Sequence, residues 1–354
     1  MITLSAFDFD KKINFKIFEN TLERSDFILG KSVGEFETKF ADYNNAPACV
    51  STANCTDSLR LCLQAHGIGV DDTVAVPSFT WLSTAEVVKQ LGAKCLFIDI
   101  NESLTIDTED LQQKLKLHPE TKALIFVDLF GNVADIDYIK QIAKETDTKI
   151  IQDSAQSTGA FYKKQPLYRG HPICFSFYPT KNLGCWGDAG AVVCDQEFAS
   201  IIKSLRNHGQ GSEKFISRSV GWNSRMDSLQ ADVLLNKLPF LDQWNARRRE
   251  IAEYYKQSIT IDCWFQKINL DCTPVYHQYT IITDKAEKIQ NQLSEKNIQS
   301  RIYYKTPIHK LELYNNGQTL QMTESISGRN ICIPVHQYLT DAQVDYIVES
   351  VNGT

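Results

Sequence analysis

The fold is decided by residues 121–156, which read TKALIFVDLFGNVADIDYIKQIAKETDTKIIQDSAQ. Two apolar runs in this stretch, 123–127 and 149–151, have the length and composition of buried strands. Between them, residues 136–144 place apolar side chains at helical spacing. A strand, a helix and a strand at this distance form a right-handed crossover, so we expect two parallel strands covered by the helix.

The same alternation continues outward from this stretch. Further strands are expected at 73–76, 94–98 and 173–177, and further helices at 57–65, 83–90 and 108–117. The pattern predicts an α/β fold with a mostly parallel sheet covered by helices. In such sheets ligands bind at the carboxyl ends of the strands, so the functional residues are sought there.

From about residue 227 the alternation ends. Helices are then expected at 228–238, 241–257, 287–296 and 341–351, with short strands after residue 261. We therefore predict a large domain, 1–259, and a smaller α+β C-terminal domain, 260–354.

Composition narrows the classes of function. The chain has 354 residues, 43% of them hydrophobic and 23% charged, as in an ordinary globular protein. A net charge of −6 argues against nucleic acid as a partner. The N-terminus lacks the pattern of a secretory signal, and no segment has the apolar length that crosses a bilayer. We therefore expect a cytoplasmic protein with no membrane partner.

The ten cysteines are scattered, with no C-x-x-C pair. Several lie in apolar, strand-like runs, among them Cys95, Cys174 and Cys194. This distribution favours buried, reduced thiols in a cytoplasmic protein, and it argues against a zinc or other metal site.

One polar turn presents a single lysine. Residues 176–184, SFYPTKNLG, follow the strand expected at 173–177, and further glycines stand at 187 and 190. A partly desolvated lysine on a rigid turn has a lowered pKa and becomes nucleophilic, and glycines let the backbone approach a ligand. Taken alone, the stretch could equally be an exposed lysine in a glycine-rich loop.

The strand at 149–151 leads into Asp153 at the same edge of the sheet. A buried carboxylate in this position can pair with the protonated ring nitrogen of pyridoxal phosphate. By itself Asp153 could also be the N-cap of a following helix.

Two further polar turns precede helices: 51–57, STANCTD, and 221–227, GWNSRMD. Helix N-termini suit a phosphate, although plain helix capping needs the same residue types. Together, the turns, the aspartate and the lysine downstream of it supply each part of a pyridoxal phosphate site. A dinucleotide site of the Rossmann type would need glycines at the first helix, and 53–56 contains none.

The chain resembles the DegT family of nucleotide-sugar aminotransferases, which are pyridoxal-phosphate enzymes of fold type I. The resemblance covers nearly the whole chain. Besides the lysine turn, it rests on FILG at 27–30, PSFTW at 77–81, LRNHG at 205–209, PIH at 307–309 and IP at 333–334. It implies pyridoxal 5'-phosphate as cofactor and a homodimer with shared active sites.

The resemblance implies two catalytic residues. Lys181 carries the cofactor as a Schiff base and moves the proton, and Asp153 pairs with the ring nitrogen. The implied cofactor-binding residues are Cys55, Thr56, Trp81, Asp153, Gln156, Ser176, Lys181 and Asn223. Of these, Trp81 stacks on the cofactor, Gln156 lies near the ring hydroxyl, Thr56 and Ser176 bind the phosphate, and Asn223 reaches it from the other subunit. The implied substrate-binding residues are Tyr178, Asn182, Tyr303, Tyr304 and His309.

The chain departs from the family pattern at three positions. Cys55 and Ala189 stand where glycine is usual, and Thr158 stands where histidine is common. These changes affect the expected loop geometry and leave Lys181 and Asp153 untouched. A dehydrating branch of the family carries histidine in place of the lysine, so Lys181 favours transamination.

The resemblance implies that L-glutamate donates an amino group to a keto-deoxy sugar nucleotide, with pyridoxamine phosphate as intermediate and ping-pong kinetics. Residues 223–231 and 54–59 resemble the branch acting on dTDP- or UDP-linked 3-keto sugars, whereas 303–305 differs from it. The amino sugar would serve a surface polysaccharide, such as lipopolysaccharide, or a glycosylated product. The alternatives are a 4-keto sugar aminotransferase, a pyridoxal-phosphate-dependent sugar dehydratase and a non-catalytic regulator that binds the cofactor.

Overall fold

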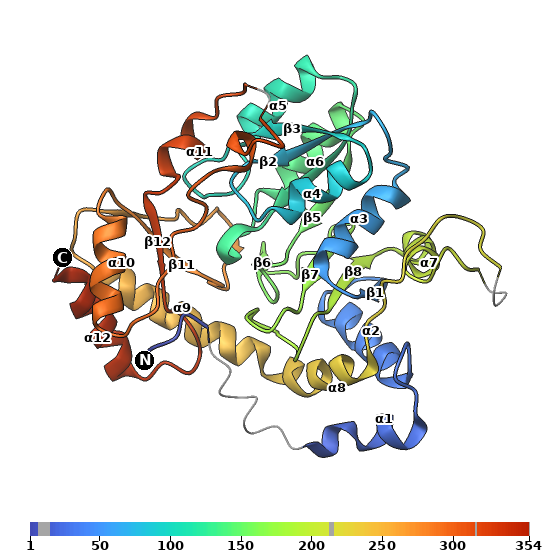
Figure 1. The fold of residues 1–354 in the computed structure, drawn as a ribbon, viewed down its shortest axis with the longest axis horizontal. Coiled ribbons are helices and arrows are strands. Elements are labelled where there is room, and N and C mark those ends of the chain that lie inside the picture. Colours follow the sequence, from blue (N-terminus) through green and yellow to red (C-terminus); the bar gives the residue numbers. More distant parts are fainter. Residues whose placement is uncertain (6–14, 212–215, 316, 354) are drawn as a thin grey trace.

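The computed structural model describes residues 1–5, 15–211, 216–315 and 317–353. A seven-stranded sheet runs through the large domain in the order β1-β8-β7-β5-β4-β2-β3 (Figure 1). Its strands are β1 (Ala48–Thr52), β2 (Thr73–Pro77), β3 (Lys94–Ile98), β4 (Thr121–Val127), β5 (Lys149–Asp153), β7 (Ile173–Ser176) and β8 (Gly190–Cys194). Only β8 runs opposite to the other strands of this sheet, which confirms the predicted mostly parallel arrangement.

Helices cover both faces of this sheet because its strands are apolar on both sides. Along β2, Ala75 joins the core on one face, and Val74 and Val76 join the core on the other, as the two-residue period of a strand requires. The first face is packed by α2 (Lys31–Tyr43), α5 (Thr108–Leu117), α6 (Ile136–Glu145) and α8 (Ser228–Lys237). The second is packed by α3 (Cys55–Ala65), α4 (Ser83–Gln90) and α7 (Gln196–Leu205).

The C-terminal part of the chain forms a second core beside the sheet (Figure 1). Helix α9 (Leu241–Ser258) leads into it, after a 3-10 turn at Leu238–Phe240 that separates α8 from α9 near the expected break. Its sheet has the order β12-β11-β9, with β9 (Trp264–Phe265), β11 (Tyr279–Ile282) and β12 (Asn330–Ile333). Helices α10 (Ala286–Glu295) and α12 (Asp341–Asn352) pack on it. The domain boundary after residue 259 stays a prediction.

The remaining elements are short. They are α1 (Glu19–Arg24), α11 (Gln321–Ile326), the pair β6 (Phe161–Tyr162) and β10 (Cys272–Thr273), and 3-10 turns at Phe15–Phe18, Leu129–Gly131 and Ile308–Lys310. No helix within the described ranges is long and apolar enough to span a bilayer. All ten cysteines are free thiols, and seven of them are buried.

Candidate active site

Three strands bring the predicted cofactor residues to one edge of the sheet. Strands β1, β5 and β7 run in the same direction, because β8 is antiparallel to both β1 and β7 and β5 is parallel to β7. Their carboxyl ends therefore lie at a common edge. This edge carries Asp153 at the end of β5, Ser176 at the end of β7, and the start of α3 just beyond β1.

The lysine turn leaves β7 and is held rigidly by its own backbone. Phe177 N–H donates to Ala189 O and Cys185 N–H donates to Phe177 O, both at 2.8 Å. Gly184 is required in this turn, because a Cβ there would lie 2.5 Å from Pro179 O. The buried Lys237 adds a 2.7 Å hydrogen bond from its Nζ to Gly184 O.

This turn places Lys181, which is half-buried, at the same edge of the sheet as Asp153. Burial lowers the pKa of Lys181, and the nearby Cys55 and Asp153 side chains partly oppose that shift. An amine with a lowered pKa is more often neutral, so it can act as nucleophile and as base. Cys55 and Asp153 therefore lie near enough to Lys181 to influence its charge.

Asp153 is buried, with 6% of its surface exposed. Its carboxylate accepts hydrogen bonds from Thr84 Oγ1 and Ala155 N–H, each at 3.1 Å. Burial raises the pKa of Asp153, while the Ala155 N–H, Lys181 and Thr84 oppose the rise. A carboxylate that is costly to leave ionised and unpaired suits a protonated ring nitrogen as partner.

The start of α3 forms the third part of the site. Asn54 caps this helix by accepting a 2.8 Å hydrogen bond from Asp57 N–H. The first N–H groups of a helix have no partner within it and form an anion site, so Cys55 and Thr56 stand where a phosphate would bind. Gly190 of β8 allows the close approach that shapes this site, because a Cβ there would lie 2.5 Å from the Asn54 carbonyl carbon. These donors, the amine of Lys181 and the buried carboxylate of Asp153 fit pyridoxal phosphate.

Gln156 and Tyr304 meet beside Asp153, although they come from different parts of the chain. Gln156 Oε1 accepts a 2.7 Å hydrogen bond from Phe130 N–H. Burial raises the pKa of Tyr304, while the neighbouring Gln156 side chain opposes the rise and Asp153 adds to it. The Tyr304 ring stands edge-on to Phe79, with 5.3 Å between the centroids.

The other predicted residues differ in their exposure and in their contacts. Trp81 and Tyr178 are 61% and 51% exposed, and Asn223 is exposed as well. Tyr303 is half-buried and packs beside Tyr304, with 5.5 Å between the ring centroids. Thr56 hydrogen-bonds the hydroxyl of Ser83 at 2.8 Å, and the buried Ser176 hydroxyl accepts the Tyr178 N–H at 3.3 Å.

Asn182 and His309, both expected to contact substrate, make internal hydrogen bonds. The Asn182 amide donates to Asn245 Oδ1 at 2.8 Å and to Val275 O at 3.0 Å. His309 is fully buried, with Nδ1 2.6 Å from Ser78 Oγ and Nε2 3.1 Å from Glu324 Oε1. Both ring nitrogens are therefore engaged inside the protein, and a substrate role for either residue stays a prediction.

Sequence reasoning missed two residues at this edge, Thr84 and Asp128. Thr84 donates to Asp153, and Asp128 is a fully buried carboxylate directly after β4. A signal for Asp128 was present, because an aspartate that ends a buried parallel strand lies at the same edge as Asp153.

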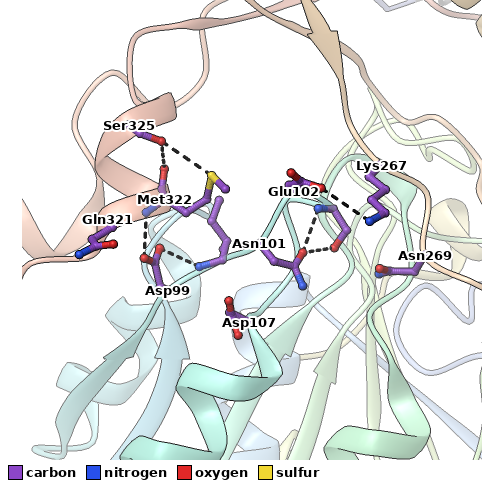
Figure 2. Close-up of a pocket in the computed structure, with 11 residues that line it drawn as sticks. Asp99, Asn101, Glu102, Asp107, Lys267, Asn269, Gln321, Met322 and Ser325 are labelled. Carbon is purple, nitrogen blue, oxygen red and sulfur yellow. Dashed lines mark hydrogen bonds and ion pairs between the residues drawn. The ribbon is translucent and has the colours of Figure 1, made fainter.

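A cavity of about 640 Å³ lies away from these residues, beyond the end of β3 (Figure 2). Its polar side chains serve local structure. Asp99 accepts the N–H groups of Met322 and Thr323, and Asn101 accepts that of Ser103. Neither Lys181 nor Asp153 lines this cavity, so its size does not make it the active site.

Comparison with known proteins identifies the family. The profile of the DegT/DnrJ/EryC1/StrS aminotransferase family matches residues 9–352. The chain is 35% identical to UDP-2-acetamido-2-deoxy-3-oxo-D-glucuronate aminotransferase of Pseudomonas aeruginosa, over 95% of this chain and 94% of the relative. It is 36% identical to dTDP-3-amino-3,6-dideoxy-alpha-D-galactopyranose transaminase of Aneurinibacillus thermoaerophilus, over 94% and 92%.

Among solved structures, a DegT DnrJ EryC1 StrS aminotransferase from Brucella abortus superposes with a TM-score of 0.92. It is 34% identical, and the match covers 96% of this chain and 94% of that one. The predicted family, fold type and cofactor are thereby confirmed. The chain belongs to the DegT/DnrJ/EryC1/StrS aminotransferase family and is a pyridoxal-phosphate-dependent aminotransferase of fold type I.

Proposed function

We propose that this enzyme transfers an amino group from L-glutamate to the 3-position of a dTDP- or UDP-linked keto-deoxy sugar. The observation that carries the proposal is the common sheet edge that holds the lysine turn after β7 and the buried carboxylate of Asp153 at the end of β5. The 3-position is supported by two relatives whose names specify a 3-oxo or a 3-amino sugar nucleotide.

The residues of the site would divide the work. Lys181 would hold the cofactor through Nζ, Asp153 would face the ring nitrogen, and the start of α3 with Ser176 would hold the phosphate. When bound, pyridoxal phosphate supplies an electron sink for the bond that is broken. The lowered pKa of Lys181 lets Nζ take a proton and return it, as a general base and then a general acid.

A homodimer would complete the site. Trp81 and Tyr178 are exposed in the single chain, and exposed large hydrophobic side chains often mark a surface that a partner covers. The segment at Ile28 pairs with Asp227, close to the exposed Asn223. In our proposal a second copy covers this surface, and Asn223 reaches the cofactor phosphate of the partner subunit.

The thiols of the chain and the use of its product together suggest where the enzyme acts. Ten free thiols are typical of a protein kept in a reducing compartment, which supports the cytoplasm. The amino sugar would be used in a surface polysaccharide such as lipopolysaccharide, or in a glycosylated product.

The proposal is tested with a panel of 3-keto and 4-keto sugar nucleotides carrying dTDP, UDP or GDP. Purified enzyme and glutamate should convert a 3-keto member to an amino sugar, detected by mass spectrometry, with one 2-oxoglutarate formed per turnover. Amination of 4-keto members alone would contradict the 3-position. Ammonia release without an aminated sugar would instead identify a dehydratase. Lys181→Ala should lower turnover by several orders of magnitude, because the nucleophile and the proton carrier are lost together.

A further inference from the structure

Asp128 is a buried carboxylate that accepts four hydrogen bonds. Its Oδ2 atom accepts hydrogen bonds from Gln152 Nε2 at 2.7 Å, Ser154 Oγ at 2.7 Å and Ser157 Oγ at 2.9 Å. Its Oδ1 atom accepts the Ala134 N–H at 3.1 Å. Three of the four donors therefore belong to the short segment 152–157.

This segment is the one that carries Asp153 and Gln156. Alternate residues of a strand point to opposite sides, so Gln152 and Ser154 face Asp128 while Asp153 faces Thr84. The backbone adds a further link, because Asp128 N–H donates to Asp153 O at 3.0 Å. Asp128 thus binds the side of the 152–157 segment opposite to the Asp153 side chain.

The loop that follows Asp128 holds Gln156 as well. Phe130 donates its N–H to the Gln156 side chain, and it does so from the left-handed region, with φ of 60°. This conformation is costly for a bulky residue and persists only where the surroundings enforce it. The next residue must be glycine, because a Cβ at Gly131 would lie 2.9 Å from the backbone nitrogens of Tyr276 and His277.

The charge of Asp128 is what allows one oxygen to accept so many donors. A buried carboxylate is costly to desolvate, and its hydrogen bonds must offset that cost. An asparagine in the same place would turn its NH₂ group toward either the Ala134 N–H or the Gln152 amide, so that two donors would face each other. Burial raises the pKa of Asp128 to about 6, against the lowering effect of these four donors.

We propose that Asp128 is a positioning residue that fixes the 152–157 segment, and thereby sets how Asp153 and Gln156 meet the cofactor. This inference rests on the cofactor roles proposed for Asp153 and Gln156. Asp128 itself touches neither the substrate nor the cofactor in this assignment.

The test compares Asp128→Asn with Asp135→Asn. Asp135 lies in the same connection between β4 and α6, where it accepts hydrogen bonds from Tyr138 N–H and Tyr162 OH and none from 152–157. In the protein freed of cofactor, Asp128→Asn should speed amide hydrogen exchange in peptides covering 152–157, while Asp135→Asn should leave it unchanged. Pyridoxal phosphate should then bind Asp128→Asn about ten- to a hundredfold more weakly, if the effect is as large as that of removing an outer partner of a metal ligand.

In the loaded enzyme, the ¹⁵N resonance of the cofactor ring nitrogen should shift in Asp128→Asn, and kcat with glutamate should fall more than KM rises. If Asp128→Asn does not fold, the double variant Ser154→Ala/Ser157→Ala removes two donors, keeps the carboxylate and should show smaller effects of the same kind. Unchanged exchange in 152–157 would overturn the proposal. Faster exchange with unchanged cofactor affinity and resonance would also overturn it, because the role would then be structural only. Asp153→Asn, measured alongside, separates this failure from a wrong assignment of Asp153.

Discussion

At the scale of single residues, two lysines of this chain show how partners decide what burial does. Lys237 is buried, and its Nζ donates a hydrogen bond to the backbone oxygen of Gly184, which stabilises the lysine turn. Burial of Lys181 instead lowers the pKa of its amine, which keeps a reactive group at a cost in stability.

We therefore expect Lys181→Met to stabilise the cofactor-free protein by about 1 kcal/mol at pH 7, the size typical when a functional group is replaced. The matched change Lys237→Met should destabilise it. The pKa of Lys181 in the folded protein lies below its usual value of 10.5. Between these two pKa values the unfolded chain therefore binds more protons than the folded chain does. The advantage of Lys181→Met should therefore shrink as the pH rises toward 10.5. Urea unfolding at pH 7 and pH 10 gives the free energy of unfolding of each variant. If Lys181→Met and Lys237→Met lowered it by the same amount, the predicted difference between the two lysines would be contradicted.

Asp153 gives a second prediction at this scale. Asp153→Asn should fold and still capture the cofactor at Lys181, as borohydride reduction followed by peptide mapping would show. It should slow the half-reaction with glutamate by roughly a hundredfold or more, because a neutral amide does not keep the ring nitrogen protonated. Thr84→Val, which removes only one hydrogen bond to Asp153, should have a smaller effect in the same single-turnover assay. Near-normal rates in Asp153→Asn would remove this residue from the mechanism.

At the scale of secondary-structure elements, the start of α3 depends on the strand beside it. Gly190 of β8 lies against Asn54 and Cys55, so a side chain there would push the first turn of α3 away. Gly34 of α2 is the opposite case, because a Cβ at that position meets nothing within 4 Å.

Gly190→Ala should therefore weaken binding of pyridoxal phosphate much more than binding of pyridoxal, which lacks the phosphate. Gly34→Ala should leave both affinities unchanged and stabilise the protein by about 0.5–1 kcal/mol, the gain of alanine over glycine within a helix. Fluorescence titration with the two ligands checks the first outcome, and thermal unfolding checks the second. Equal weakening for both ligands would argue against a phosphate site at α3.

At the scale of the whole molecule, the proposed homodimer predicts complementation between two inactive chains. Lys181→Ala removes the nucleophile, and Asn223→Asp places a negative charge where the partner's phosphate would lie. If sites are shared, a mixed dimer contains one site with both lesions and one with neither, so mixing should restore activity toward a statistical fraction of wild type.

Two controls make this test decisive. The subunits must exchange on the timescale of the assay, and Asn223→Asp alone must be impaired. With both satisfied, a mixture that stays inactive would show that Asn223 acts in its own subunit or has no role at the phosphate.

The sequence by itself determined the parts of this protein that depend on short-range pattern. The apolar runs at 123–127 and 149–151 lie in β4 and β5, and the helix expected between them is α6, because periodicity is local information. Asp153 and Lys181 could be predicted as site residues for the same reason, since a polar residue at or just after the end of a buried strand is visible in a few consecutive positions. The parallel sheet then brought them to one edge.

Only the tertiary structure decided which distant residues complete the site and which serve the core. His309 pairs with Ser78, 231 positions away in the chain, and this contact explains its full burial. Tyr304 reaches Gln156, and Asp128 collects the donors of 152–157, although nothing in their local sequence marks these partners. Such contacts depend on how separate strands and loops pack in three dimensions. Local propensity carries no information about that packing, so they became visible only in the folded chain.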